Sequence, residues 1–375
     1  MVAIYRALRR AKSFLDAAKG TLRSKASRGA RRQIAIKDAE IVALRKELAR
    51  TRGEEPPAST PAFFVVGYQK SGTTWLMRML DSHPEILCKG EGRFFGGSWR
   101  QESVKRIDAK RPPSSLYNAV LDAEYLRLWI ERSVWSRNDA ADEHLTNITR
   151  MAIDYFLMGE LSKTSKRLVG DKSPLLTPEI IKEIAGIYPE AKVIHIIRDG
   201  RDAAVSAAHH SRNFGRTRKK NAEASVKREA YRGDHQRLRE TGESMFAGDS
   251  LKKMAAEWGE RVGRTIEDGP ALLGDNYAQV RYEDLLEGPE EEVRRLLEFL
   301  RAGANEEVVR QCVSSASFEK LSRGRKRGQE DPSSFFRKGV AGDWKSVFTE
   351  EDKQIFKEEV GDLLVELGYE RDTSW

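Results

Sequence analysis

The nine residues from Gly67 to Trp75, GYQKSGTTW, combine the residue types that bind a phosphate-like anion. They follow a short apolar run at residues 62–66, which is typical of a buried strand, and we expect a helix over 73–81. A strand that turns through small residues into a helix directs several backbone N–H groups and the positive end of the helix dipole towards one point. Lys70 adds a full cation, and two threonines add hydroxyls. The segment therefore predicts an anion-binding loop.

The order of residues in this loop differs from that of a nucleoside triphosphatase. Such a loop places lysine directly after its second glycine, followed by a Ser or Thr that holds Mg²⁺. Here Thr73 follows Gly72, and Lys70 lies two residues before that glycine. The loop is therefore arranged for another anion than a magnesium-bound triphosphate.

A second anion-binding feature follows another expected strand, Val193 to Ile197. Arg198 comes at the carboxyl end of this strand, where ligands bind in open α/β sheets. Ser206 lies eight residues further, on an expected helix. A guanidinium fork and a hydroxyl can hold one phosphate between them.

A third feature lies near the C-terminus. Arg337, Lys338 and the amide of Gly339 form a compact anion site on a loop that glycine permits. The basic run at residues 323–327 lies upstream, and its composition favours a solvated loop.

Four segments in this order resemble sulfotransferases that use 3′-phosphoadenosine 5′-phosphosulfate (PAPS). QKSGTTW, beginning at Gln69, resembles the 5′-phosphosulfate loop of that family, usually PKSGTTW. The other three segments are RDGRD from Arg198, QVRYEDL from Gln279 and FRKGVAGDWK from Phe336. The resemblance covers about residues 62 to 350.

This resemblance implies the roles of the co-substrate residues. In the family the loop lysine contacts the oxygen that bridges sulfur and phosphorus, the tryptophan lies beside the adenine, and the later Arg, Ser and Lys residues bind the 3′-phosphate. The family transfers its sulfuryl group without a metal, and no cluster here has metal-ligand spacing. We expect the PAPS-binding residues to be Lys70, Ser71, Gly72, Thr73, Thr74, Trp75, Arg198, Ser206, Tyr282, Arg337, Lys338 and Gly339.

Sulfuryl transfer also needs a group that accepts a proton and a cation at the leaving oxygen. Lys70 suits the second role. For the first, KGEGRFF from Lys89 resembles both the Lys-Glu-x-His-Phe-Phe segment of carbohydrate sulfotransferases and the Lys-Thr-His segment of cytosolic ones. Both alignments make Glu91 the base, although a surface ion pair with Lys89 or Arg93 is the alternative. Lys172, in GDKSP, resembles a lysine near the acceptor in carbohydrate members, and we expect it to be catalytic.

Strands that alternate with helices predict an α/β fold with a parallel β-sheet flanked by helices, and the resemblance implies a P-loop-like sulfotransferase fold. Residues 59–375 are the expected sulfotransferase domain. Residues 1–58 read as a basic helical arm, in which Ile34, Ile41 and Leu48 recur every seven residues as in a short coiled coil.

Charge is concentrated in this arm. The chain of 375 residues has a net charge of +8, and residues 1–58 hold fifteen Lys or Arg against six Asp or Glu, a surplus of nine. The remainder is therefore near −1. The arm has only two aromatic residues, Tyr5 and Phe14, so a nucleic-acid partner is not expected. Two readings stay open: a solvated arm, or one that binds a membrane surface or self-associates.

Two cysteines and the absence of a long apolar run favour a cytoplasmic protein, peripheral to a membrane if the arm binds one. The predicted function is sulfuryl transfer from PAPS to a hydroxyl or amine of an acceptor, with carbohydrate and lipid as open classes. Tyr117, Tyr125, Trp129 and Trp135 suit either an acceptor pocket or a core. The alternatives are a P-loop kinase or nucleotidase, and an inactive nucleotide-binding scaffold.

Overall fold

The computed structural model describes residues 61–96, 124–136, 141–175, 177–214, 243–246, 248–331 and 334–375, with isolated positions elsewhere. The side chains of residues 211–214 are not among those described. The predicted arm at residues 1–58 lies outside the described residues except at four isolated positions. Its helical and coiled-coil character therefore stays a prediction.

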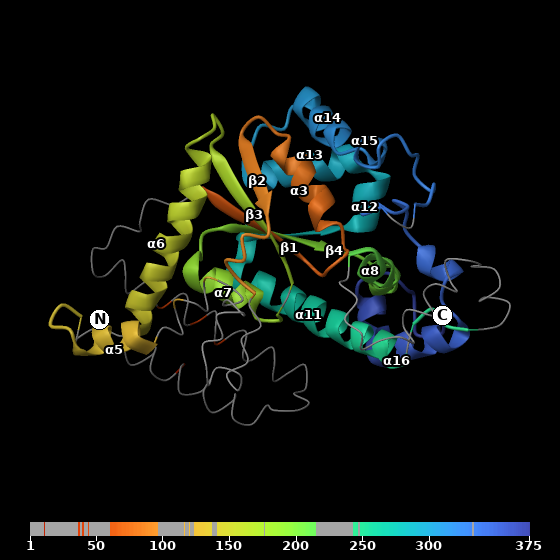
Figure 1. Cartoon of the computed structure of the whole chain (residues 1–375), viewed down its shortest axis with the longest axis horizontal. Helices are drawn as coiled ribbons and strands as arrows, with labels where there is room; N and C mark the ends of the chain where they lie inside the picture. Colours follow the sequence, from red (N-terminus) through yellow and green to blue (C-terminus); the bar gives the residue numbers. More distant parts are fainter. Residues whose placement is uncertain are drawn as a thin grey trace. The chain divides into compact units, whose positions relative to one another are not determined.

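A five-stranded parallel sheet forms the centre of the fold, in the order β2-β3-β1-β4-β5 (Figure 1). In β1 and β4, Phe63 pairs with Lys192 and Val66 with His195. The prediction of a parallel sheet is confirmed. The strands are β1 (Ala62–Gly67), β2 (Ile86–Gly90), β3 (Leu168–Pro174), β4 (Lys192–Ile197) and β5 (Tyr277–Arg281).

Helices connect and flank these strands. The helix predicted over residues 73–81 is present with these bounds, and Ser206 lies on a helix, Gly200–Phe214, as expected. The described helices are α3 (Thr73–Asp81), α5 (Glu124–Arg132), α6 (Ala141–Leu161), α7 (Ile180–Ile187), α8 (Gly200–Phe214), α11 (Ser250–Leu273), α12 (Tyr282–Glu287), α13 (Pro289–Leu300), α14 (Glu306–Ser315), α15 (Phe318–Leu321) and α16 (Glu350–Glu366), with the 3₁₀ turns η2 (Gly274–Asn276) and η3 (Asp343–Ser346).

The described chain divides into two compact units. The first contains residues up to Val66, Pro84–His195 and Arg264–Ala278, and in it α6 packs against α5, α7 and β3. The second contains Gly67–His83, Ile196–Gly263 and Gln279–Trp375. In this second unit α14 packs against α3 and α13, and α8 packs against η3.

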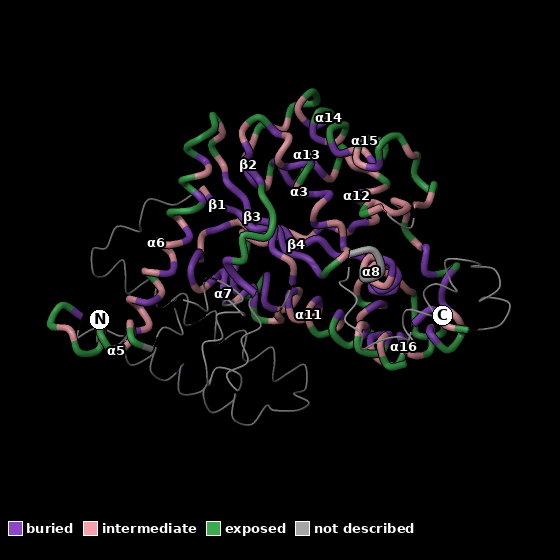
Figure 2. The backbone as a smooth tube through the Cα atoms, viewed as in Figure 1, coloured by how far each residue is buried: buried purple, intermediate pink, exposed green. Residues whose placement is uncertain are grey.

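The first unit holds a core built on β1, whose six residues are all buried (Figure 2). The ring of Phe64 meets the ring of Phe95 edge-on, with centroids 5.3 Å apart. Gly170 in β3 faces Phe63 so closely that a Cβ atom at this position would lie 2.2 Å from the ring. Strand β3 therefore needs glycine here, and burial on both faces explains why β1 is apolar throughout.

Candidate active site

The predicted anion loop between β1 and α3 is tightly curved. Lys70 and Gly72 both have left-handed backbone conformations, with φ of 67° and 91°. The amide of Ser71 donates to the carbonyl of Tyr68 at 3.1 Å, which closes the turn. A Cβ atom on Gly72 would lie 2.6 Å from the Tyr282 ring, so glycine is required by both the conformation and the space.

The interior of this loop has polar groups with no partner inside the described part of the chain. The hydroxyl of Ser71 is fully buried and has no hydrogen-bond partner there. Among the described residues, no side-chain cap is found at the N-terminus of α3. A buried hydroxyl and free helix amides lose free energy when left unpaired, so these groups fit an anionic ligand.

Arg198, at the end of β4, is buried beside this loop. Its guanidinium donates to the carbonyl of Lys70 at 3.1 Å and to that of Val340 at 3.2 Å. It also lies over the Tyr282 ring, 4.3 Å from the centroid. The Nε atom of Arg198 is buried without a partner among the described residues, so this N–H can donate to a ligand.

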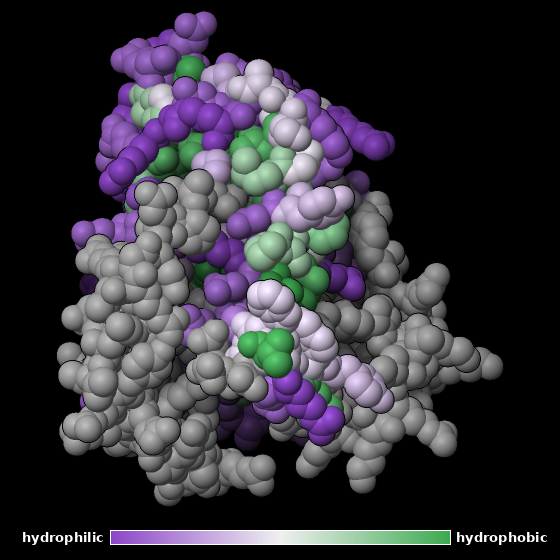
Figure 3. Space-filling view, turned by 90° about the vertical axis from the view of Figure 1, so that its left-hand side faces the viewer, coloured by the Kyte–Doolittle hydropathy of each residue, from purple (hydrophilic) through white to green (hydrophobic). Residues whose placement is uncertain are grey.

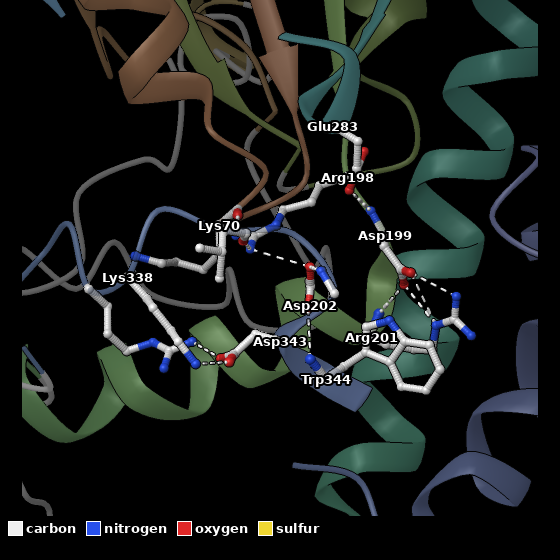
Figure 4. Close-up of polar contacts among 12 residues, drawn as sticks. Lys70, Arg198, Asp199, Arg201, Asp202, Glu283, Lys338, Asp343 and Trp344 are labelled. Atoms are coloured by element: carbon white, nitrogen blue, oxygen red, sulfur yellow. Dashed lines mark hydrogen bonds and ion pairs between the residues drawn. The ribbon is translucent and has the colours of Figure 1, made fainter. Parts of the chain in front are cut away.

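The Lys70 ammonium lies close enough to Arg198 and Arg337 to be repelled by their positive charges. Figure 4 shows Lys70 near Arg198. Its Nζ atom lies 4.3 Å from the centroid of the Phe335 ring. Burial, together with Arg198 and Arg337, lowers the pKa of Lys70 to about 8. Cations from three separate segments thus converge in the second unit, and burial and their repulsion disfavour the charged form of Lys70 unless an anion lies beside it.

The third predicted feature contains two cations, Arg337 and Lys338, and both contact carboxylates. Arg337 donates to Glu330 at 2.5 Å and also pairs with Asp343. Lys338 donates to the other oxygen of Asp343 at 2.6 Å. Gly339 has a φ of 67°, and a Cβ atom there would lie 2.4 Å from the Phe318 ring.

The basic run upstream of this loop is not uniformly solvated. Arg325 is half-buried and donates to the carbonyls of Phe336 at 2.6 Å and Arg337 at 2.7 Å. The interpretation of residues 323–327 as a solvated loop is therefore wrong for Arg325. This side chain fixes the backbone of the anion loop, and no motif in the sequence indicates that role.

A cavity of about 290 Å³ lies beside Trp75 in the same unit. The Trp75 indole donates to the carbonyl of Ala316 at 2.8 Å, and its ring centroid lies 5.5 Å from that of Tyr282. Among the lining residues, sequence reasoning assigned a co-substrate role only to the tryptophan, and it interpreted Arg327 as part of a solvated basic run. The cavity is lined by Trp75, Met79, Glu290, Arg310, Val313, Ser314, Ala316, Ser317 and Arg327.

Ser206 is half-buried on α8, beyond Arg198. Thr73 begins α3, and its side chain is buried. His195 on β4 is fully buried and hydrogen-bonds the Tyr277 hydroxyl at 2.8 Å. Burial lowers the pKa of His195 to about 3, so this histidine is neutral and structural.

In the first unit, the structure joins Glu91 and Lys172. The register of β2 and β3 pairs Gly90 with Lys172, which places the next residue of the loop beside it. The Lys172 ammonium donates to Glu91 at 2.7 Å, and the Glu91 amide donates to the carbonyl of Lys172 at 2.8 Å. The sequence indicated both residues but not their pairing, which depends on the alignment of strands distant in sequence.

The two partners differ in exposure. The Glu91 side chain is 60% exposed, whereas that of Lys172 is 5% exposed. The hydrogen bond from Lys172 holds the pKa of Glu91 below its usual value and outweighs partial burial, with Arg93 adding to the effect. Lys89 pairs instead with Glu160. The carboxylate is therefore ionised and open to solvent at neutral pH.

The loop after Glu91 is fixed by a buried carboxylate. The Gly92 amide donates to Asp171 at 2.9 Å, and the Ser173 hydroxyl donates to the other oxygen of Asp171. Burial raises the pKa of Asp171.

Within the described ranges, no three His, Cys, Asp or Glu side chains are grouped so that they could hold a metal ion. No described helix is long and apolar enough to span a membrane.

The aromatic residues expected in a pocket or a core lie on the surface of the first unit. Figure 3 shows green and near-white residues among hydrophilic ones on the side of the molecule that carries α5 and α6. Tyr125, Trp129 and Trp135 are 90%, 60% and 88% exposed, so core packing does not explain them. Tyr117 lies outside the described residues.

Comparison with known proteins gives the family. Sulfotransferase 1A1 of Bos taurus is 33% identical over 85 residues, 20% of this chain and 29% of that protein. Nodulation protein NoeE of Sinorhizobium fredii is 26% identical over 319 residues, 82% of this chain and 66% of that protein. This chain thus spans less than a third of the length of the bovine relative.

A crystal structure of a mouse sulfotransferase complexed with PAP is similar with a TM-score of 0.45 and 18% identity, covering 83% of this chain and 88% of that one. The family model described as "Sulfotransferase domain" matches residues 60–368, most of the chain. This match shows that the chain belongs to the sulfotransferase family.

Proposed function

We propose that the protein transfers a sulfuryl group from PAPS to a hydroxyl or amine of an acceptor. The observation that carries the proposal is the convergence of Lys70, Arg198 and Arg337 on a loop whose buried Ser71 hydroxyl has no partner among the described residues. Three cations from separate segments suit a nucleotide that carries two separate anionic groups. PAPS has such groups, a 3′-phosphate and a 5′-phosphosulfate.

Each part of the second unit then has one role. The loop from Lys70 to Thr74 binds the 5′-phosphosulfate through its amides and hydroxyls. Arg198, Ser206 and the loop Arg337–Gly339 bind the 3′-phosphate. The adenine lies against the Trp75 and Tyr282 rings, and the cavity beside the tryptophan supplies room for a base.

The chemistry assigned to the chain balances without a metal. Glu91 takes the proton of the acceptor hydroxyl or amine, whose oxygen or nitrogen forms a bond to sulfur as the bond from sulfur to the bridging oxygen breaks. Lys70 donates to this bridging oxygen, which gains the negative charge. Lys172 keeps Glu91 ionised and oriented through its 2.7 Å hydrogen bond.

We propose that the acceptor is a carbohydrate or a lipid, which the exposed aromatic side chains of α5 and α6 support. Exposed Trp and Tyr rings present flat apolar faces with polar edges, which suit sugar rings and lipid headgroup regions. We further propose that residues 59–375 form the catalytic domain of a cytoplasmic enzyme. The basic arm would then bind a membrane surface or a second copy.

Calorimetric titration with adenosine 3′,5′-bisphosphate (PAP), compared with ATP plus Mg²⁺, tests the proposal. We expect micromolar binding of PAP that requires the 3′-phosphate and is unchanged by Mg²⁺ or EDTA. Preference for Mg²⁺-ATP would instead favour the kinase or nucleotidase alternative. Binding of PAP without transfer from PAPS to any hydroxyl or amine acceptor would favour the inactive scaffold.

A further inference from the structure

We propose that Asp202 is a positioning residue that sets selectivity for the nucleotide 3′-phosphate, because it holds Arg198 and the turn from Gly342 to Trp344 as one anion site. The inference rests on the proposed function and adds to it a residue that the motifs do not assign. Asp202 does not touch the nucleotide in this scheme. It acts through the groups that do.

Asp202 lies in the first turn of α8 and is 1% exposed. One carboxylate oxygen accepts the Trp344 amide at 2.9 Å, and the other accepts the Gly342 amide at 2.7 Å. The second oxygen also lies 3.6 Å from the guanidinium of Arg198. Figure 4 shows Asp202 between Arg198 and Trp344. One buried side chain thus connects segments that are 140 residues apart in sequence.

The turn that Asp202 holds carries Asp343, which orients two further cations. Gly342 has a φ of 76° and directly precedes η3 as its N-cap, so the turn depends on a left-handed residue. Asp343 lies between the two amides that Asp202 accepts, and its carboxylate contacts both Arg337 and Lys338. A displaced turn would therefore move the partner that aligns both of these side chains.

Asp202 also restricts the orientation of the Arg198 guanidinium. This guanidinium already donates to the carbonyls of Lys70 and Val340, and its third polar contact is with Asp202. The Nε atom is left as a donor with no partner in the described structure. Asp202 thus helps to fix the direction of the guanidinium, including its Nε–H donor.

The arrangement carries an electrostatic cost that a purely apolar contact would avoid. Burial raises the pKa of Asp202 and outweighs the opposing effect of Arg198. A buried carboxylate is kept at an anion site only if its hydrogen bonds to the two amides and its ion pair with the arginine offset that cost. Replacement by asparagine would place an NH₂ group against one of the two amide donors.

The test compares the dissociation constants of PAP and adenosine 5′-phosphate for the wild-type chain and for Asp202→Asn. The matched control is Asp352→Asn. Asp352 is also buried in the second unit and accepts a backbone amide, that of Thr349, at 3.0 Å. Adenosine 5′-phosphate lacks the 3′-phosphate, so the ratio of the two constants isolates that group.

For Asp202→Asn we expect PAP to bind roughly 10- to 100-fold more weakly, while the constant for adenosine 5′-phosphate changes by about 2-fold or less. Asp352→Asn should keep the wild-type ratio. An equal loss for both nucleotides, or an unchanged ratio, would show that Asp202 has only a structural role. A wild-type chain without preference for PAP would instead overturn the proposed function, and the inference with it.

A second variant covers the case in which Asp202→Asn does not fold. Gly342→Ala strains the backbone of the same turn, because alanine disfavours a φ of 76°. The added Cβ atom causes no clash, since no described atom lies within 4 Å of it. We expect a smaller loss of PAP selectivity, about 3- to 10-fold, with a melting temperature near that of the wild type. An unchanged ratio in a folded Gly342→Ala chain would count against the inference.

Discussion

At the scale of single residues, the proposed base and its partner divide two tasks. Glu91 is exposed, so it can meet an acceptor, whereas Lys172 is buried and fixed by its place in β3. The lysine lowers the pKa of the carboxylate, which keeps it ionised at the cost of some basicity. The pair is thus suited to an acceptor whose own proton is released as the bond to sulfur forms.

Replacement of either partner separates these tasks. We expect Glu91→Gln to lower turnover by at least about 100-fold while the dissociation constant of PAP changes by about 2-fold or less. Lys172→Met should raise the pKa of Glu91, so that activity is lost at a higher pH as the solution is acidified. The pH profile of kcat/KM for the acceptor measures both effects.

Lys89→Met is the matched control, since Lys89 pairs with Glu160 and not with the proposed base. It should leave the acidic limb of the profile in place. If Lys172→Met also left that limb unchanged, the ion pair would have no part in the working enzyme.

At the scale of elements, local sequence determines some strands and long-range packing determines others. The apolar runs of β1 and β4 could be recognised directly, and so could the residues at their carboxyl ends. Strand β3, LVGDKSP, has no such run and was not predicted, because it is defined by its pairing with β2 and by the approach of Phe63 to Gly170. The roles of Asp202 and Arg325 are missed for the same reason, since their partners lie elsewhere in the chain.

Two glycines on different elements test this close approach. Gly170→Ala should lower the free energy of unfolding by about 1–3 kcal/mol, because the new Cβ would lie 2.2 Å from the Phe63 ring. In α7, the new Cβ atom of Gly186→Ala would have none of the neighbouring described atoms within 4 Å. This variant should raise the free energy of unfolding by about 0.5–1 kcal/mol. Urea denaturation measures both. Similar values for the two variants would contradict the packing described for β3.

At the scale of the whole molecule, net charge and local charge are unrelated. Residues 1–58 carry a surplus of nine positive charges, more than the whole formal charge of +8, and the remainder is near −1. The positive site formed by Lys70, Arg198 and Arg337 is therefore a product of folding rather than of composition. Composition alone could exclude functions for this chain, but only ordered motifs could indicate where an anion binds.

Global stability should depend on pH through Glu183. This side chain on α7 is 8% exposed and accepts the Gly96 amide at 2.7 Å, and burial raises its pKa from 4.5 to about 7. The folded state thus binds more protons than the unfolded state between these values. The corresponding stability is present below about pH 4.5 and is lost as the pH rises through about 7.

We therefore expect Glu183→Gln to be more stable than the wild type at pH 8 by up to about 3 kcal/mol, with the difference much reduced at pH 5. Urea denaturation at the two pH values measures it. A pH-independent difference would mean that this carboxyl group is not shielded from water in the folded chain.

The lowered pKa of Lys70 has a consequence for the heat of nucleotide binding. At a pKa of about 8, a fraction of free chains has a neutral lysine near pH 8, and an anion beside it would restore the charge. Binding then takes up protons from the buffer, and the measured enthalpy varies with the ionisation enthalpy of that buffer. Arginine at this position stays charged, so Lys70→Arg should abolish the variation. The anion loop would in that case couple co-substrate binding to proton uptake. The number of protons taken up per bound nucleotide would be largest in mildly alkaline solution.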